Sequence, residues 1–130
     1  MANILIIDDD PSIVKMLEIE LKAMGHKVSS AESAEEAIVK IKTNPPDIIT
    51  LDIQMPGDGG LAVANELDNS KLQIPFIICT GSDITDPSKA FELFIVRHLY
   101  AGFLKKPMKY PEIESAVNKA LELVKQLKNK

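Results

Sequence analysis

The sequence predicts an α/β fold, in which helices cover both faces of a five-stranded parallel sheet to make one doubly wound, three-layer sandwich. Short apolar runs such as Ile4–Ile7 and Pro75–Cys79 have no polar interruption, which is typical of strands buried on both faces. Helical segments separate these runs, and the strand–helix alternation repeats five times. Alternation of this kind indicates a parallel sheet with right-handed crossovers.

Each expected element has its own local signal. Asp10-Pro11 is a helix cap followed by a first-turn proline, and Ser33 with Glu36 forms a capping box. Strands are expected in the β-rich apolar segments, and helices where apolar residues recur on one face. The expected strands are Ile4–Ile7, Val28–Ala31, Pro46–Leu51, Pro75–Cys79 and Gly102–Leu104. The expected helices run from Pro11 to Gly25, over Ala34–Lys42 and Leu61–Leu67, from Pro87 to about Tyr100, and onward from Pro111.

Composition narrows the class of protein. The chain has 130 residues, of which 45% are hydrophobic, and a net charge of −4, so a single ordered domain over residues 1–130, with no output domain, is expected. Nineteen acidic against fifteen basic residues disfavour direct binding of nucleic acid. Because no apolar run approaches the roughly 18 residues of a membrane span and no signal peptide is evident, no membrane contact and a cytoplasmic location are expected.

Polar residues follow the predicted strands at their carboxyl ends, where parallel sheets bind ligands. Asp8, Asp9 and Asp10 follow the first run, Asp52 the third, Thr80 the fourth, and Lys105-Lys106 the fifth. Clustered carboxylates repel one another, and a divalent cation such as Mg²⁺ relieves that repulsion through oxygen ligands. A carboxylate can also act as a nucleophile toward phosphorus, and a lysine and a hydroxyl can stabilise the phosphoryl oxygens.

Four stretches together resemble the receiver domain of two-component response regulators, the chemotaxis-Y-like type with a flavodoxin-like (βα)5 fold. They are Ile4-Leu5-Ile6-Ile7-Asp8-Asp9-Asp10-Pro11, Asp47-Ile48-Ile49-Thr50-Leu51-Asp52-Ile53-Gln54-Met55-Pro56-Gly57, Ile77-Ile78-Cys79-Thr80-Gly81 and Gly102-Phe103-Leu104-Lys105-Lys106-Pro107. The resemblance covers the whole chain. The segment from Thr80 to Lys106 is a few residues longer than the family pattern leads us to expect.

The resemblance implies a role for each matching residue. Asp52 is similar to the phospho-acceptor, while Asp8, Asp9, Asp52 and the backbone carbonyl of Gln54 are similar to the ligands of Mg²⁺. In the same way Lys106 matches the lysine that pairs with the phosphoryl group. The two remaining matches are switch residues: Thr80 supplies the switch hydroxyl and Phe103 the switch aromatic ring.

The resemblance also implies partners and a mode of action. A sensor histidine kinase or a histidine phosphotransfer protein would supply the phosphoryl group from a phospho-His. The chain would be a signalling phosphoprotein rather than an enzyme, with only slow self-catalysed phosphorylation and dephosphorylation. Phosphorylation would change the face formed by the fourth strand, fourth helix, fifth strand and fifth helix, which would then bind another protein.

The predicted fourth helix carries more apolar residues than one packed face requires. Phe91, Ile95 and Leu99 form one stripe, and other apolar residues lie off it. One interpretation is a helix that is unusually buried. The other is a surface for a downstream protein or for a second copy in a homodimer, formed by Phe91, Leu93, Val96 and Tyr100.

Two alternatives remain open at the level of sequence. A haloacid-dehalogenase-like phosphatase also begins with an apolar strand and an Asp-x-Asp motif, and Asp8 would then be its nucleophile. Against it, no acidic motif follows the lysine except Glu112 and Glu114 on the last helix. The second alternative is a pseudo-receiver, a binding module that keeps the fold but is not phosphorylated.

Overall fold

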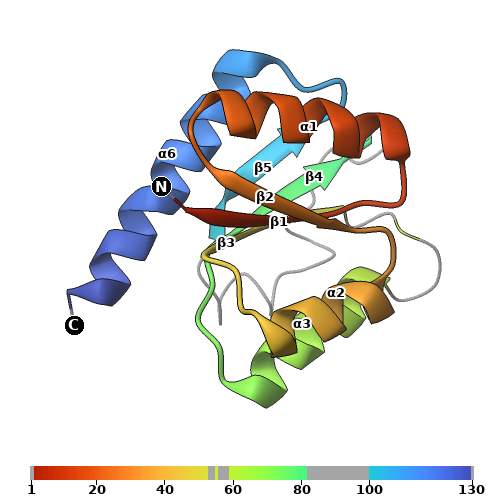
Figure 1. Ribbon diagram of the computed structural model, residues 1–130, viewed down its shortest axis with the longest axis vertical. Helices are drawn as coiled ribbons and strands as arrows, with labels where there is room; N and C mark the ends of the chain where they lie inside the picture. Colours follow the sequence, from red (N-terminus) through yellow and green to blue (C-terminus); the bar gives the residue numbers. More distant parts are fainter. Residues whose placement is uncertain (1, 53–54, 56–58, 82–99, 130) are drawn as a thin grey trace.

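A computed structural model describes residues 2–52, 55, 59–81 and 100–129 of the chain. Five parallel strands form one sheet in the order β2-β1-β3-β4-β5 (Figure 1). The order reverses between β1 and β3, and open α/β sheets bind their ligands beyond the carboxyl ends of the strands at such a switch point. The strands are β1 (Asn3–Ile7), β2 (Lys27–Ala31), β3 (Ile48–Asp52), β4 (Phe76–Thr80) and β5 (Tyr100–Lys105).

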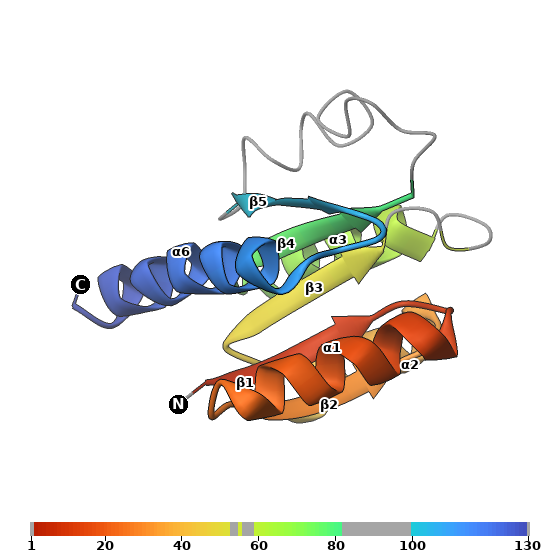
Figure 2. The same ribbon diagram turned by 90° about the horizontal axis from the view of Figure 1, so that it is seen from above.

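Helices cover both faces of the sheet, as the sequence predicts. Helices α1 and α6 pack on one face and α2 and α3 on the other, so the domain has three layers (Figures 1 and 2). The helix expected between Pro87 and Tyr100 lies outside the described residues. The described helices are α1 (Pro11–Ala23), α2 (Ala34–Thr43), α3 (Gly59–Ser70) and α6 (Tyr110–Lys128).

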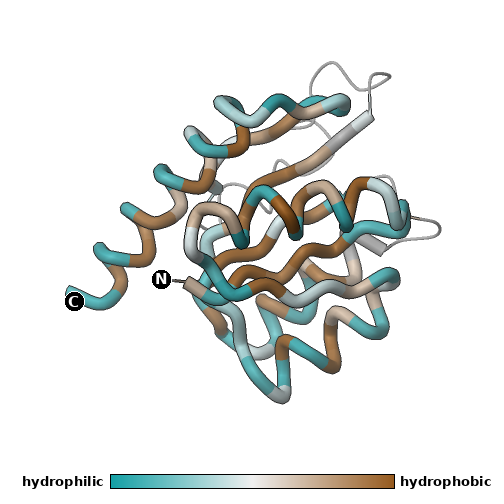
Figure 3. Tube along the Cα trace, turned by 45° about the horizontal axis from the view of Figure 1, so that its top comes forward, coloured by the Kyte–Doolittle hydropathy of each residue, from teal (hydrophilic) through white to brown (hydrophobic). Residues whose placement is uncertain are grey.

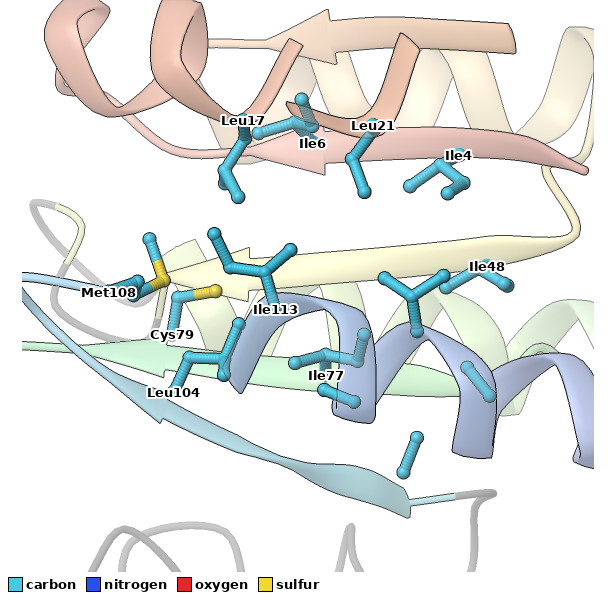
Figure 4. Packing of buried hydrophobic residues seen from close by; sticks show 14 of the residues in the cluster. Ile4, Ile6, Leu17, Leu21, Ile48, Ile77, Cys79, Leu104, Met108 and Ile113 are labelled. Atoms are coloured by element: carbon cyan, nitrogen blue, oxygen red, sulfur yellow. The ribbon is translucent and has the colours of Figure 1, made fainter. Parts of the chain in front are cut away.

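Strand alternation divides the core into two clusters. On the α1–α6 side, Ile4 and Ile6 of β1 lie beside Ile48 of β3 and Ile77 of β4, beneath Leu17 of α1 (Figure 4). The alternate strand residues point to the other face, where Leu5, Ile49 and Phe76, for example, pack under α2 and α3. Figure 3 shows the resulting pattern, with apolar strands inside and helices that are apolar on one side only. Because both faces of the sheet are covered, β1 and β3 are mostly apolar, whereas the edge strand β2 is partly exposed and carries Lys27, Ser29 and Ser30.

Helix starts follow the predicted caps. The Asp10 carboxylate accepts a hydrogen bond from the Ser12 backbone N–H at 2.9 Å, and Ser33 Oγ accepts one from the Glu36 N–H at 3.2 Å. Both bonds satisfy N–H groups that a helix cannot pair internally. Helix α3 is longer than predicted, since it begins at Gly59, a residue whose low helix propensity disguised the start.

One expectation about the fourth helix is wrong. Tyr100 does not end a helix but begins strand β5, where it pairs with Phe76 of β4. Its ring is partly buried against that of Phe76, with centroids 5.6 Å apart. Aromatic residues suit strands as well as helices, so the apolar run before Gly102 conceals this boundary. Among the described residues, no helix has the length and apolar character needed to cross a bilayer.

Candidate functional site

The acidic residues predicted to converge do so at the carboxyl ends of β1 and β3. Asp52 is the last residue of β3, and Asp8 directly follows β1, which pairs with β3 up to Ile7 and Leu51. Asp8 is 1% exposed and Asp52 is 3% exposed, whereas Asp9 is exposed. One carboxylate oxygen from each of the three lies within 4.8 Å of the others.

Backbone geometry holds Asp8 in place. Its backbone N–H donates to the Ala31 carbonyl of β2 at 3.1 Å, which extends the β1–β2 ladder by one residue. Its Oδ1 accepts a hydrogen bond from the Asp10 N–H at 2.9 Å. Asp10 itself caps α1, and its side chain turns toward Ser12. The three consecutive aspartates therefore have different environments, and Asp10 is a cap as predicted rather than a member of the carboxylate cluster.

Lys106 brings positive charge to the cluster from the segment after β5. Its ammonium Nζ lies 2.9 Å from Asp8 Oδ2 and 3.3 Å from Asp52 Oδ2. Partial burial lowers the pKa of Lys106, but the hydrogen bonds and charges of Asp8 and Asp52 outweigh burial, so the pKa is raised overall. Lys106 is therefore a cation held by two buried carboxylates.

The charge balance of this cluster favours a bound cation. Among the described residues, three carboxylates gather with one ammonium group, that of Lys106, and two of the carboxylates are almost fully removed from water. Buried charge without a counter-charge is costly. A small hard cation that prefers oxygen ligands and retains water fits such a donor set, and Mg²⁺ is the biological cation with that preference. The residues present thus suit the predicted metal.

Of the other predicted residues, the structure describes Thr80 and Phe103. Thr80 ends β4 and pairs in register with Lys105 of β5, so its backbone lies at the same edge of the sheet as Asp52. Phe103 lies on β5 and is 45% exposed. Gln54, predicted to offer a backbone carbonyl to the metal, is outside the described residues, as are Phe91, Leu93 and Val96 of the predicted partner surface.

Cys79 lies directly beside the phospho-acceptor candidate. It pairs with Asp52 across β3 and β4. Its side chain is 1% exposed and lies among the core residues shown in Figure 4. Burial, followed by the charge of Asp8, raises the pKa of the thiol to about 12. The side chain is therefore a neutral thiol that packs in the core beside Asp52 without adding charge.

Sequence reasoning missed one polar residue near the site. Thr50 lies two residues before Asp52 on β3 and is 1% exposed. In the part of the chain that the structure describes, the buried polar side chains are Asp8, Thr50 and Asp52. A single hydroxyl inside an otherwise apolar strand is the signal that could have revealed it.

Comparison with known proteins decides the family. Residues 4–118 match the response regulator receiver domain. The chain belongs to this family. The acidic cluster, the lysine and the 2-1-3-4-5 strand order of this receiver domain agree with that assignment. The family match also decides against the haloacid-dehalogenase-like alternative.

Related sequences are response regulators. The receiver domain is 33% identical over 120 residues to the alkaline phosphatase synthesis transcriptional regulatory protein PhoP of Bacillus subtilis, covering 92% of this chain and 48% of PhoP. It is also 33% identical over 129 residues to the response regulator SaeR of Staphylococcus aureus, covering 97% of this chain and 53% of SaeR. The chain thus spans about half the length of these relatives.

Similar solved structures agree. A response regulator receiver domain protein from Clostridium thermocellum superimposes with a TM-score of 0.82 at 26% identity, covering 98% of this chain and 99% of the other. The chemotaxis protein CheY4 of Vibrio cholerae gives a TM-score of 0.78 at 27% identity, covering 92% and 98% of the two chains. These neighbours share the receiver fold over nearly their whole lengths.

Proposed function

We propose that this receiver domain accepts a phosphoryl group on the carboxylate of Asp52. The observation that supports it best is the position of Asp52, which is 3% exposed and lies with a lysine ammonium 3.3 Å away and other carboxylates within 4.8 Å. A buried carboxylate at the switch point of the sheet, beside a lysine ammonium, suits nucleophilic attack on phosphorus.

The donor is a phospho-His of a sensor histidine kinase or a histidine phosphotransfer protein. An Asp52 oxygen forms a bond to phosphorus while the bond from phosphorus to the imidazole nitrogen breaks, and the electron pair returns to that nitrogen. Hydrolysis of the acyl-phosphate later restores the carboxylate. This donor chemistry is proposed from the family of the chain, since the relatives are response regulators.

The residues around Asp52 have complementary tasks. Lys106 is close enough to neutralise charge on the phosphoryl oxygens. Asp8 and Asp9, with Asp52 and the Gln54 carbonyl, would hold Mg²⁺. When bound, that ion offsets the repulsion between carboxylate and phosphate.

The phosphorylated form differs from the resting form by nearly two negative charges and three acceptor oxygens. We propose that Thr80 donates its hydroxyl to these oxygens and that Phe103, 45% exposed on β5, changes position with it. The downstream protein, or a second copy of the chain, would bind the face that includes β4, β5 and α6. A location in the cytoplasm remains a prediction.

The direct test is the intact mass of the protein after incubation with acetyl phosphate and Mg²⁺. We expect the mass of one added phosphoryl group on the parent protein and none on the Asp52→Asn variant. The control is Glu35→Gln, which removes an exposed acid from α2 and should be phosphorylated like the parent.

The same mass measurement distinguishes a phosphorylated receiver from the remaining alternative, a pseudo-receiver. A protein that binds Mg²⁺ but gains no mass from acetyl phosphate or from a phosphorylated histidine phosphotransfer protein would be a pseudo-receiver. Equal phosphorylation of the parent and Asp52→Asn would show that a different residue is the acceptor.

A further inference from the structure

Among the buried polar side chains of the described residues, Thr50 is the one to which the proposed phosphorylation gives no role. It is 1% exposed, and its hydroxyl Oγ1 has no hydrogen-bond partner among the protein atoms described. A buried hydroxyl without a partner costs free energy that a valine of the same shape would avoid. Its presence in the central strand of the sheet therefore requires an explanation.

The position of Thr50 shows where a partner could come from. Strand alternation places it on the same face as Asp52, two residues away, or about 6.6 Å along β3. The register pairs Thr50 with Ile6 of β1 and with Ile77 of β4, and both of these point toward α1 and α6 (Figure 4). Asp8 follows β1 two residues after Ile6, so it is the diagonal neighbour of Thr50 toward the carboxylate cluster.

The Asp8 carboxylate can accept more hydrogen bonds than its described partners supply. An ionised carboxylate offers about four lone-pair sites. Asp8 Oδ1 accepts from the Asp10 N–H, and Asp8 Oδ2 faces Lys106 at 2.9 Å. Asp8 thus offers acceptor sites at a position diagonal to Thr50, whose hydroxyl proton has no acceptor among the described protein atoms. The Thr50 hydroxyl makes no direct hydrogen bond to the carboxylates of Asp8 and Asp52. Its position two residues from Asp52 along β3 suits a bridge through one water molecule.

Size supports the same arrangement. Three of the neighbours of Thr50 on this face of the sheet are isoleucines, at positions 6, 48 and 77. Threonine has one heavy atom fewer than isoleucine and a polar tip, so it leaves space beside a polar group. Buried waters occupy such places, where they make about three hydrogen bonds to otherwise unpaired groups.

We propose that Thr50 holds a buried water molecule that donates hydrogen bonds to the carboxylates of Asp8 and Asp52. Thr50 is then a positioning residue, because the water fixes the orientation of carboxylates that Thr50 does not touch. Outer groups of this kind orient metal ligands and commonly alter metal affinity. The metal part of this proposal rests on the proposed function of the site, whereas the water itself does not.

The decisive variant is Thr50→Val, which keeps the shape of the side chain and removes the hydroxyl. If the water bridge exists, the variant leaves the water and the carboxylates short of partners, so the midpoint of thermal unfolding without divalent cation falls. The affinity for Mg²⁺, measured by calorimetric titration, falls about tenfold. Thr50→Ser keeps the hydroxyl and should retain an affinity within about twofold of the parent. In a high-resolution crystal structure, the parent shows a water within hydrogen-bond distance of Thr50 Oγ1.

A matched control is Ile77→Val, which removes one methylene from the position opposite Thr50 on β4. It should lower the unfolding midpoint and leave the affinity for Mg²⁺ unchanged. An unchanged or raised midpoint in Thr50→Val would overturn the proposal, because removal of an unpaired hydroxyl stabilises a core. An unchanged affinity in Thr50→Val, or no water at Thr50 in the crystal structure, would also overturn it. Failure of Asp52 to be phosphorylated would alter none of these readouts, so the two proposals fail separately.

Discussion

The ammonium of Lys106 lies closer to Asp8 than to Asp52, at 2.9 Å from Asp8 Oδ2 and 3.3 Å from Asp52 Oδ2. The lysine therefore acts as the counter-ion of both carboxylates in this structure. A divalent cation held by Asp8 and Asp52 would compete with this ammonium group for the negative charge of the two carboxylates. Competition between Lys106 and the cation is thus built into the cluster, and its consequences can be measured.

Replacement of Lys106 by methionine leaves Asp8 and Asp52 without that ammonium group. Because both carboxylates are buried and Lys106 is itself partly exposed, we expect the free energy of unfolding without Mg²⁺ to fall by about 2 kcal/mol. We also expect Mg²⁺ to stabilise Lys106→Met more than the parent, since the competing ammonium is gone. Urea denaturation with and without Mg²⁺ checks both results. A variant that gains no more from Mg²⁺ than the parent would contradict the competition.

The raised pKa of Lys106 has a consequence at alkaline pH. Because the pKa is higher in the folded state than the ordinary value of 10.5, the ion pairs contribute stability that is present below pH 10.5. This contribution is lost as the pH rises through the folded-state pKa. The parent should therefore lose more stability than Lys106→Met between about pH 9.5 and 12. Parallel denaturation curves across that range test the sign.

His26 is expected to make the stability of the fold depend on pH on the acid side of neutrality. Its Nδ1 accepts a hydrogen bond from the Ala2 backbone N–H at 3.1 Å. Burial, and then the positive charge of the amino terminus, lower its pKa below 6.5. The unfolded chain then binds the proton more readily, so stability falls as the pH drops below about 6.5.

The test compares the parent with His26→Gln, because a glutamine side chain has an acceptor that does not titrate in this range. Thermal unfolding between about pH 7.5 and 5 should show a shallower loss of stability in the variant. Equal slopes for the two proteins would mean that His26 does not contribute to the acid sensitivity of the fold.

Asp10 is expected to matter for stability and not for the metal. Asp10→Ala removes the acceptor for the Ser12 N–H at the start of α1 and should lower the free energy of unfolding by about 1 kcal/mol. Asp10→Ser keeps a capping oxygen and should recover most of that loss. Neither variant should change the affinity for Mg²⁺ by more than about twofold. A large loss of affinity in Asp10→Ser would instead place Asp10 among the metal ligands.

Cys79 is expected to be inert in the folded protein. Its thiol is fully buried and has a pKa of about 12, so only about one molecule in ten thousand carries a thiolate at pH 8. Ellman's reagent should give no colour with the native protein over minutes and one equivalent after denaturation in guanidinium. Rapid reaction of the native protein would show that the core beside Asp52 opens.

Much of this domain follows from local patterns in the chain. Uninterrupted apolar runs indicate buried parallel strands because a polar residue there would have no partner. Asp10 and Ser33 mark helix starts because their side chains pair with free backbone N–H groups. The resemblance to the receiver family then predicts that Asp8, Asp52 and Lys106, which lie far apart in the sequence, form one site.

Other features depend on contacts that no local pattern contains. Tyr100 begins β5, where it pairs with Phe76 of β4 and packs its ring on the Phe76 ring, a contact between segments far apart in the sequence. The closer approach of Lys106 to Asp8 depends on where β5 ends relative to β1 and β3. The isolation of the Thr50 hydroxyl likewise arises only when isoleucines from the neighbouring strands close around it. Hydrophobic periodicity and caps act within one segment, whereas burial and charge pairing are set by the segments that meet in three dimensions.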